Sequence, residues 1–295
     1  MPDGFDVKQL RRLAARPWSV VAADDGVELF LRRWTTAGER ACKVLLCLHG
    51  LGGHGGGYEA LGKDLAEHGI EVYAMDHRGH GLSGGRRGDV ADFGTFMNDA
   101  HAMLRHAARE RPGSPLFLLG ESMGGIIAIH CARLFPAEIS GLVLAAAGIR
   151  PNLKPSAKDV AALLAILLPS LVYPSGLWVN TEANWHRAAA DAKRLEQMKQ
   201  DPLLLRRVSP RLLLKIAPYF RTILTVCAPA IRLPSLILQG TADQLVSLKG
   251  AEDFHAKLAS DDKTIKTYEG AGHGLFNWDG ADRVIRDVRL WLTQR

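Results

Sequence analysis

The sequence predicts an α/β protein, with a mostly parallel central sheet flanked by helices and one helical insertion. Short strand-like runs, among them the wholly apolar Val44–Leu48, alternate with helical stretches up to residue 149 and again from residue 233. Such runs are typical of strands buried on both faces of a parallel sheet. Between them, residues 150–232 have helical composition, repeated prolines and no clear strand pattern. We therefore expect a core formed by residues 1–149 and 233–295, and a helical cap, or lid, formed by residues 150–232.

The elements of this core are expected in a regular order. The turn signal Asp24-Asp25-Gly26 separates Val20–Ala23 from Glu28–Arg33, which predicts an opening β-hairpin. Further strands are expected at Val44–Leu48, Ile70–Met75, Leu116–Leu119, Gly141–Ala147, Ser235–Gln239 and Thr264–Tyr268. Helices are expected at Tyr58–His68, Phe93–Arg111, Met123–Phe135, Gly250–Leu258 and Asp282–Thr293.

The composition is that of an ordinary globular protein. The chain has 295 residues and a net charge of +6, too modest to indicate a nucleic-acid partner. Its four cysteines lack CxxC spacing and are expected to be buried thiols of a reducing compartment. The first 18 residues lack the apolar core of a signal peptide, and the apolar run Val160–Tyr173 is broken by Pro169 and too short to span a bilayer. These features predict a cytoplasmic protein.

The stretch Gly120-Glu121-Ser122-Met123-Gly124 lies between an expected strand and an expected helix. Gly-x-Ser-x-Gly in this setting is the nucleophile elbow of α/β-hydrolases, in which a serine on a strained turn presents its hydroxyl. The flanking glycines are needed because a side chain would clash at the bend. An ordinary strand–turn–helix connection with an incidental serine is the alternative, and the rest of the chain must decide between them.

Two further polar residues follow later strands. Asp243 follows Ser235–Gln239, and His273 follows Thr264–Tyr268. Active sites of such sheets gather at the carboxyl ends of the strands, and the order Ser…Asp…His is that of the α/β-hydrolase triad. Ser122 would attack a carbonyl carbon, His273 would take and return its proton, and Asp243 would fix the imidazole tautomer.

The glycine-rich loop His49-Gly50-Leu51-Gly52-Gly53 is the expected oxyanion hole. In this fold the backbone N–H of Leu51 and that of Met123, directly after the nucleophile, would stabilise the developing charge. The same loop also satisfies the dinucleotide-binding pattern GxGxxG, but that interpretation leaves Ser122, Asp243 and His273 unexplained. Histidines 49, 54, 77 and 80 lie in two loops without a partnering carboxylate or thiolate cluster, so we expect neither metal nor cofactor.

From His49 to the C-terminus the chain resembles the monoacylglycerol lipase and lysophospholipase family of serine hydrolases. The resemblance rests on His49–Gly52, Tyr58, Asp76–Ser83, Leu119–Gly125, Gln239–Asp243 and Tyr268–His273. It implies hydrolysis of a fatty acyl ester through an acyl-enzyme at Ser122, without a cofactor. It also makes His49, Gly50 and Glu121 candidate substrate contacts.

Two features differ from the best-known monoacylglycerol lipases of this family. Gly53 and Gly57 stand where those members carry polar or charged residues that hold the glycerol head, and Phe276 stands in place of a histidine. A lysophospholipase, a general carboxylesterase and a thioesterase therefore remain alternatives, as do lactonases, amidases and carbon–carbon hydrolases with the same triad. A different class of protein, a non-catalytic small-molecule binder on the same fold, also remains open.

The insertion carries the positive charge of the chain. Residues 150–232 hold 13 basic and five acidic residues, a net charge of +8. The segment Ala161–Leu168 is apolar nearly all round, which is typical of a helix that is buried or meets an apolar partner. A basic, apolar cap suits docking on an anionic membrane surface, whereas the alternative is that its leucines pack on the core.

Overall fold

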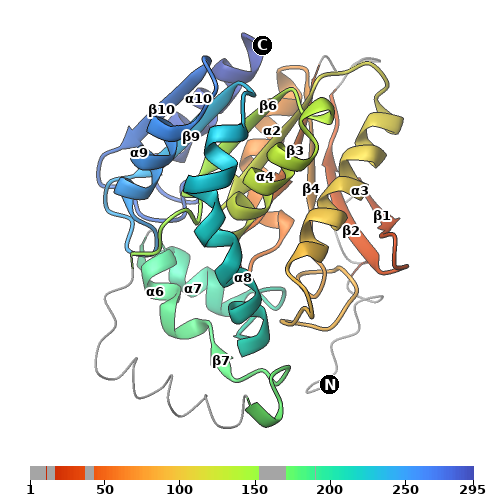
Figure 1. The fold of residues 1–295 in the computed structure, drawn as a ribbon, viewed down its shortest axis with the longest axis vertical. Coiled ribbons are helices and arrows are strands. Elements are labelled where there is room, and N and C mark those ends of the chain that lie inside the picture. Colours follow the sequence, from red (N-terminus) through yellow and green to blue (C-terminus); the bar gives the residue numbers. More distant parts are fainter. Residues whose placement is uncertain (1–10, 12–16, 37–42, 153–170, 190) are drawn as a thin grey trace.

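The computed structural model describes residues 11, 17–36, 43–152, 171–189 and 191–295, and it is built around one twisted eight-stranded sheet (Figure 1). The strands lie in the order β1-β2-β4-β3-β5-β6-β9-β10. β2 pairs antiparallel with β1 and with β4, and the remaining neighbours are parallel. In chain order the strands are β1 (Trp18–Ala22), β2 (Glu28–Trp34), β3 (Lys43–Leu48), β4 (Ile70–Met75), β5 (Leu116–Glu121), β6 (Gly141–Ala145), β9 (Ser235–Gly240) and β10 (Lys263–Tyr268). The predicted mostly parallel sheet is confirmed.

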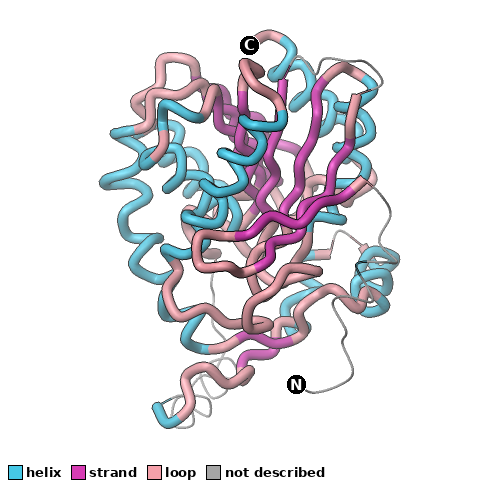
Figure 2. The backbone as a smooth tube through the Cα atoms, turned by 90° about the vertical axis from the view of Figure 1, so that its right-hand side faces the viewer, coloured by secondary structure: helices cyan, strands magenta, loops and turns pink. Residues whose placement is uncertain are grey.

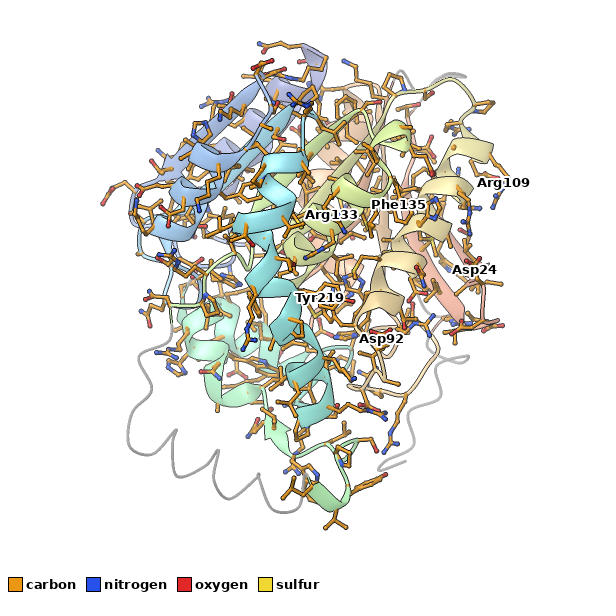
Figure 3. The ribbon with its side chains drawn as sticks, in the orientation of Figure 1. Asp24, Asp92, Arg109, Arg133, Phe135 and Tyr219 are labelled. Atoms are coloured by element: carbon orange, nitrogen blue, oxygen red, sulfur yellow. The ribbon has the colours of Figure 1, made fainter. Side chains whose placement is uncertain are left out.

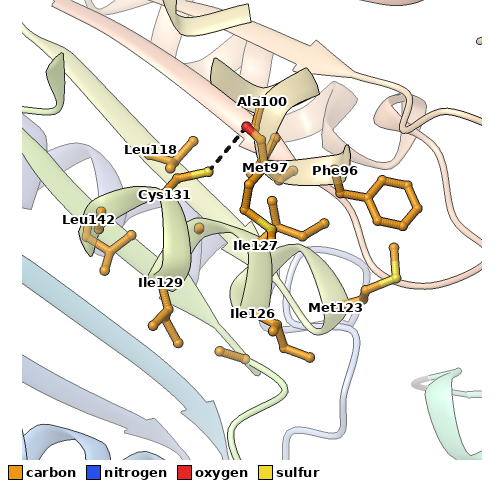
Figure 4. Close-up of a cluster of buried hydrophobic side chains, with 14 of the residues drawn as sticks. Phe96, Met97, Ala100, Leu118, Met123, Ile126, Ile127, Ile129, Cys131 and Leu142 are labelled. Atoms are coloured by element: carbon orange, nitrogen blue, oxygen red, sulfur yellow. Dashed lines mark hydrogen bonds between the residues drawn. The ribbon is translucent and has the colours of Figure 1, made fainter. Parts of the chain in front are cut away.

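Helices cover both faces of this sheet because successive side chains of a strand point to opposite sides. Val44, Leu46 and Leu48 of β3 join one buried cluster, and Leu45 and Cys47 join the other. The first cluster lies under α3 (Gly94–Glu110), α4 (Met123–Leu134) and α9 (Leu248–Lys257), and Figure 4 shows its part between α3 and α4. The second lies under α2 (Glu59–Glu67) and α10 (Ala281–Thr293). Two 3-10 turns, η1 (Gly55–Tyr58) and η2 (Pro136–Glu138), precede α2 and β6.

Three cysteines bear out the expected buried thiols. Cys47, Cys131 and Cys227 are free and buried, and burial raises the pKa of each thiol. Cys131 lies in the cluster of Figure 4, where its thiol is 3.9 Å from the Met97 carbonyl oxygen. Cys42 lies outside the described residues.

The chain between β6 and β9 forms elements that begin at the carboxyl ends of the strands, and its last helix runs back along α4 (Figure 1). They are β7 (Val179–Asn180), η3 (Glu182–Asn184), α6 (Trp185–Ala188), α7 (Ala192–Gln200), β8 (Arg207–Val208), α8 (Pro210–Thr222), the π-turn η4 (Ile223–Cys227) and η5 (Ala228–Ala230). β7 and β8 pair antiparallel, and Figure 2 shows them apart from the main sheet. The expectation of a segment without strands was wrong here, because two-residue strands are too short to show a period. The apolar stretch Ala161–Leu168 lies outside the described residues.

The helix α8 connects this group to the core. Its Tyr219, labelled in Figure 3, lies on the side of α8 that faces the core. The Tyr219 ring packs against His130 of α4 and Phe93, with ring centroids 5.0 and 4.9 Å apart. Together with η4 and η5 it spans Pro210–Ala230, which among the described residues is the one helix whose length and composition would suffice to cross a membrane. This is weak evidence for a span, since η4 packs on α4 and α9 as a helix of a globular protein would.

Candidate active site

Ser122 occupies a strained turn between β5 and α4. Its φ of 52° and ψ of −115° are unfavourable for a residue with a side chain. The turn is held by its backbone: the Ser122 N–H donates to the Ala145 carbonyl, and the Ser122 carbonyl accepts from Gly125 N (3.0 Å) and Gly148 N (2.9 Å). The strain is therefore sustained by hydrogen bonds to the end of the neighbouring strand and the start of α4.

The glycines around Ser122 are required by close backbone contacts. A β-carbon at Gly124 would overlap the Leu48 carbonyl, and one at Gly120 would overlap the Gly124 carbonyl. A β-carbon at Gly50 would lie 3.1 Å from the Ser122 β-carbon and 3.6 Å from its hydroxyl oxygen. Gly50 therefore leaves free space directly beside the serine hydroxyl.

Asp243 and His273 form a buried hydrogen-bonded pair. The His273 Nδ1 lies 2.8 Å from Asp243 Oδ2, and the exposed fractions of the two residues are 8% and 7%. The other carboxylate oxygen accepts the backbone N–H groups of Leu245 (2.8 Å) and Val246 (3.0 Å), and Gln239 Nε2 lies 3.1 Å from Oδ2. Because the carboxylate only accepts, Nδ1 carries the proton and Nε2 of the neutral ring is left with its lone pair.

The electrostatics of this pair favour its charged form. Burial opposes charging of His273, but the hydrogen bond and the charge of Asp243 outweigh it and raise the pKa of the imidazole. Burial likewise opposes charging of Asp243, while His273 and the two backbone N–H groups hold its pKa below the usual value. Within the described residues the ring of His273 has no hydrogen bond to Ser122. Such contacts often tighten only when a substrate binds.

The loop after β3 orients the backbone N–H of Leu51. The Gly50 carbonyl oxygen accepts from Gly53 N (3.1 Å) and lies 2.8 Å from His49 Nδ1. His49 Nε2 accepts the backbone N–H of His77 at 3.0 Å, so Nδ1 carries the proton and donates to Gly50. A peptide unit is planar, with its C=O and N–H pointing in opposite directions. The two hydrogen bonds on Gly50 thus fix the direction of the Leu51 N–H.

His49, His77 and His80 form a buried neutral cluster. Their ring centroids lie 4.3 to 6.1 Å apart, and each side chain is at most 3% exposed. Burial lowers the pKa of His77 to about 3 and of His80 to about 4, and it lowers that of His49 well below its usual value. Among the described residues there is no group of three or more side chains that could hold a metal ion. The cluster supports the loop backbone through hydrogen bonds such as that from His77 Nε2 to the His49 carbonyl.

Glu121 lies directly before Ser122 and points toward Tyr58. The Tyr58 hydroxyl donates to the Leu48 carbonyl at 3.0 Å and lies 3.4 Å from Glu121 Oε2. Burial raises the pKa of Glu121 above the ordinary carboxylate value. Tyr58 also packs edge-on against Phe276, with ring centroids 5.7 Å apart. Glu121 is therefore tied to the end of β3 through Tyr58.

Asp76 is a structural carboxylate beside the site, and no motif in the sequence assigned it this role. It is fully buried at the end of β4 and accepts the backbone N–H groups of Gly55 and Leu82, both at 2.7 Å, and the guanidinium of Arg32. It thereby joins the loop after β3 to the loop after β4. Its position at the carboxyl end of a strand is the signal that would have found it.

Comparisons with known proteins place this arrangement in a family. The family described as serine aminopeptidase, S33 matches residues 39–278. Human monoglyceride lipase is 33% identical over 285 residues, covering 92% of this chain and 88% of the relative. A monoacylglycerol lipase of Mycolicibacterium smegmatis is 29% identical, covering 91% and 94%. The crystal structure of Paleococcus ferrophilus monoacylglycerol lipase superposes with a TM-score of 0.78 at 26% identity, covering 90% and 99%. The chain therefore belongs to the serine aminopeptidase S33 family and is a serine hydrolase of the α/β-hydrolase fold, similar to monoacylglycerol lipases.

Proposed function

We propose that the protein hydrolyses monoacylglycerols through an acyl-enzyme at Ser122. The observation that carries this proposal is the similarity to human monoglyceride lipase, at 33% identity over 92% of the chain. The position of Ser122 on a strained turn and the Asp243–His273 hydrogen bond support the same chemistry.

The proposed mechanism assigns one task to each group. Ser122 Oγ attacks the ester carbonyl carbon while His273 Nε2 takes its proton, and Asp243 stabilises the resulting imidazolium. The N–H groups of Leu51 and Met123 donate to the oxyanion. His273 then protonates the leaving glycerol oxygen, and water hydrolyses the acyl-enzyme by the same route. We assign His49 and Glu121 to supporting the loop and strand ends, and Gly50 to leaving room for the ester beside Ser122.

A panel of esters tests the substrate class. We expect monoacylglycerol to be cleaved with a kcat/KM at least tenfold above that of lysophosphatidylcholine of the same acyl chain, with p-nitrophenyl esters of graded chain length as a reference. Equal cleavage of all head groups would contradict the proposed preference for glycerol and favour a general carboxylesterase. The structure offers a reason for such an outcome. The space beside Gly57 holds no side chain that could bind a glycerol head, and Phe276 is apolar and buried against Tyr58.

We further propose that residues 150–232 act as a cap that docks a soluble, cytoplasmic protein on anionic lipid surfaces. Leu171 and Val172 are 74% and 86% exposed, and Leu214 on α8 is 68% exposed. The backbone contact from Arg211 N to the Pro174 carbonyl (3.1 Å) places this apolar segment beside the start of α8. The exposed side chains of Arg207 and Lys215 lie on β8 and α8. Cations at such a surface attract anionic lipids, and exposed apolar side chains can enter the interface.

Salt dependence tests this docking. Because salt screens the attraction, activity on long-chain monoacylglycerol in anionic vesicles should fall several-fold between low and high ionic strength. Activity on dissolved p-nitrophenyl acetate is the control and should change little. Val172→Asp should lower only the vesicle activity. Vesicle activity that is independent of both salt and Val172→Asp would contradict docking.

A further inference from the structure

The segment Asp201–Leu205, which follows α7, lies against the glycine-rich loop after β3. The Leu205 N–H donates to the Gly52 carbonyl at 2.9 Å, and His54 Nε2 donates to Asp201 Oδ2, also at 2.9 Å. His54 Nδ1 accepts the backbone N–H of Gly56, which fixes the ring as the Nε2–H tautomer. Two hydrogen bonds of definite direction therefore join the insertion to this loop.

The segment is itself held in place from the core side. Asp201 Oδ1 accepts the Leu203 N–H at 2.8 Å, and the Leu203 carbonyl accepts from Arg87 at 3.0 Å. Arg87 also donates to the Gly81 carbonyl at 3.1 Å, in the loop after β4. The side chain of Leu205 is 2% exposed in the first buried cluster. Asp201–Leu205 is thus anchored to two core loops and to the core itself.

These contacts complete the restraint on Leu51. The Gly50 carbonyl is fixed on one side by His49 and Gly53, and the Gly52 carbonyl is fixed on the other by Leu205. Gly52 has a φ of +77°, a conformation that glycine alone adopts freely. The peptide unit between Gly52 and Gly53 is held by its N–H to Gly50 and by its carbonyl to Leu205, so loss of the Leu205 contact would remove one of its two restraints. The peptide unit before Leu51 is therefore anchored by the core, and the Gly52–Gly53 unit, the second one after Leu51, is anchored by both the core and the insertion.

We propose that Asp201 is a positioning residue for catalysis: through His54 and the Leu205–Gly52 hydrogen bond it holds the loop that carries the Leu51 N–H. The insertion then supplies part of the oxyanion geometry in addition to covering the substrate. This inference rests on the proposed hydrolase mechanism. An oxyanion donor acts only within about 2.7–3.1 Å of the charge, and a displacement of about 1 Å can cost about 100-fold in rate.

The test compares Asp201→Ala with Glu196→Ala, which removes the same charge from the exposed face of α7. Both are assayed on p-nitrophenyl acetate and on a long-chain p-nitrophenyl ester. We expect Asp201→Ala to lower kcat about 10- to 100-fold on both esters, with KM within twofold of the wild-type value. Glu196→Ala should match the wild type. A defect confined to the long-chain ester, or confined to KM, would show that Asp201 shapes only the acyl site and would overturn the proposal.

A double-mutant cycle tests the route through His54. If both residues act through one contact, Asp201→Ala combined with His54→Ala should lower kcat no further than the more harmful single change. Additive losses would contradict the route. Asp201→Asn keeps one acceptor oxygen and should therefore retain more activity than Asp201→Ala. Circular dichroism of each variant checks that it is folded. Ser122→Ala separates failure of this inference from failure of the hydrolase mechanism. If the mechanism itself is wrong, Ser122→Ala keeps its activity, whatever the result for Asp201→Ala.

Discussion

Ser122→Ala is expected to lower kcat on monoacylglycerol about 10⁵- to 10⁶-fold, because removal of a triad nucleophile leaves only binding and oxyanion stabilisation. The remaining rate is measured at a high concentration of the variant, and it counts only if it exceeds the rate that a trace of contaminating wild-type enzyme would give. The Asp243–His273 pair should persist in this variant, since Ser122 takes no part in its hydrogen bonds. A loss of less than tenfold would contradict Ser122 as the nucleophile.

The same position provides a matched test of backbone strain. Ser122→Gly removes the hydroxyl as Ser122→Ala does, but glycine tolerates a φ of 52° without cost. We expect the glycine variant to have the larger free energy of unfolding, by about 1–3 kcal/mol, while both variants are inactive. Equal stability of the two variants in denaturant titrations would contradict a strained elbow.

Asp243→Asn is expected to lower kcat about 10⁴-fold, and the structure gives the reason. Two backbone N–H groups face Oδ1, so the asparagine must place its oxygen there and turn its NH₂ group toward His273 Nδ1. His273 would then accept at Nδ1 and carry its proton on Nε2, which is the wrong tautomer for a base. Glu252→Gln, an exposed charge on α9, is the control and should keep full activity.

The pH profile of kcat/KM distinguishes this loss from general damage. Only neutral His273 can take the serine proton, so activity should fall as pH falls through its pKa and level off above it. Asp243 raises that pKa by stabilising the imidazolium. In the wild type the acid limb should therefore lie above the pKa of an unperturbed histidine side chain, about 6.5, and in Asp243→Asn it should shift to lower pH. An unshifted acid limb would contradict the role of Asp243 as the partner of the base.

The sequence predicted the sheet well because its central strands are short, mainly apolar and separated by clear turns. The carboxyl ends of those strands also pointed to Ser122, Asp243 and His273, and the structure places the latter two in hydrogen-bond contact. That rule works because parallel strands end at one edge of a sheet, so positions far apart in the chain are brought together by topology alone.

Contacts of the insertion could not be predicted in the same way. The hydrogen bond between His54 and Asp201 joins residues 147 positions apart and depends on how an irregular segment crosses the core. Neither residue carries a periodic signal, and the paired strands β7 and β8 have two residues each. Four histidines, 49, 54, 77 and 80, raised the alternative of a metal site. Burial and hydrogen bonds explain His49, His77 and His80 as supports of the loop backbone, and His54 lies against Asp201.

In the proposed mechanism Ser122 forms a covalent acyl-enzyme with the help of His273. Covalent labelling of the folded protein by a fluorophosphonate tests this directly, and mass spectrometry identifies the modified peptide. We expect one label per chain on Ser122, complete loss of labelling in Ser122→Ala, and slow labelling in His273→Ala. Labelling of another residue, or no labelling of protein that circular dichroism shows to be folded, would contradict it.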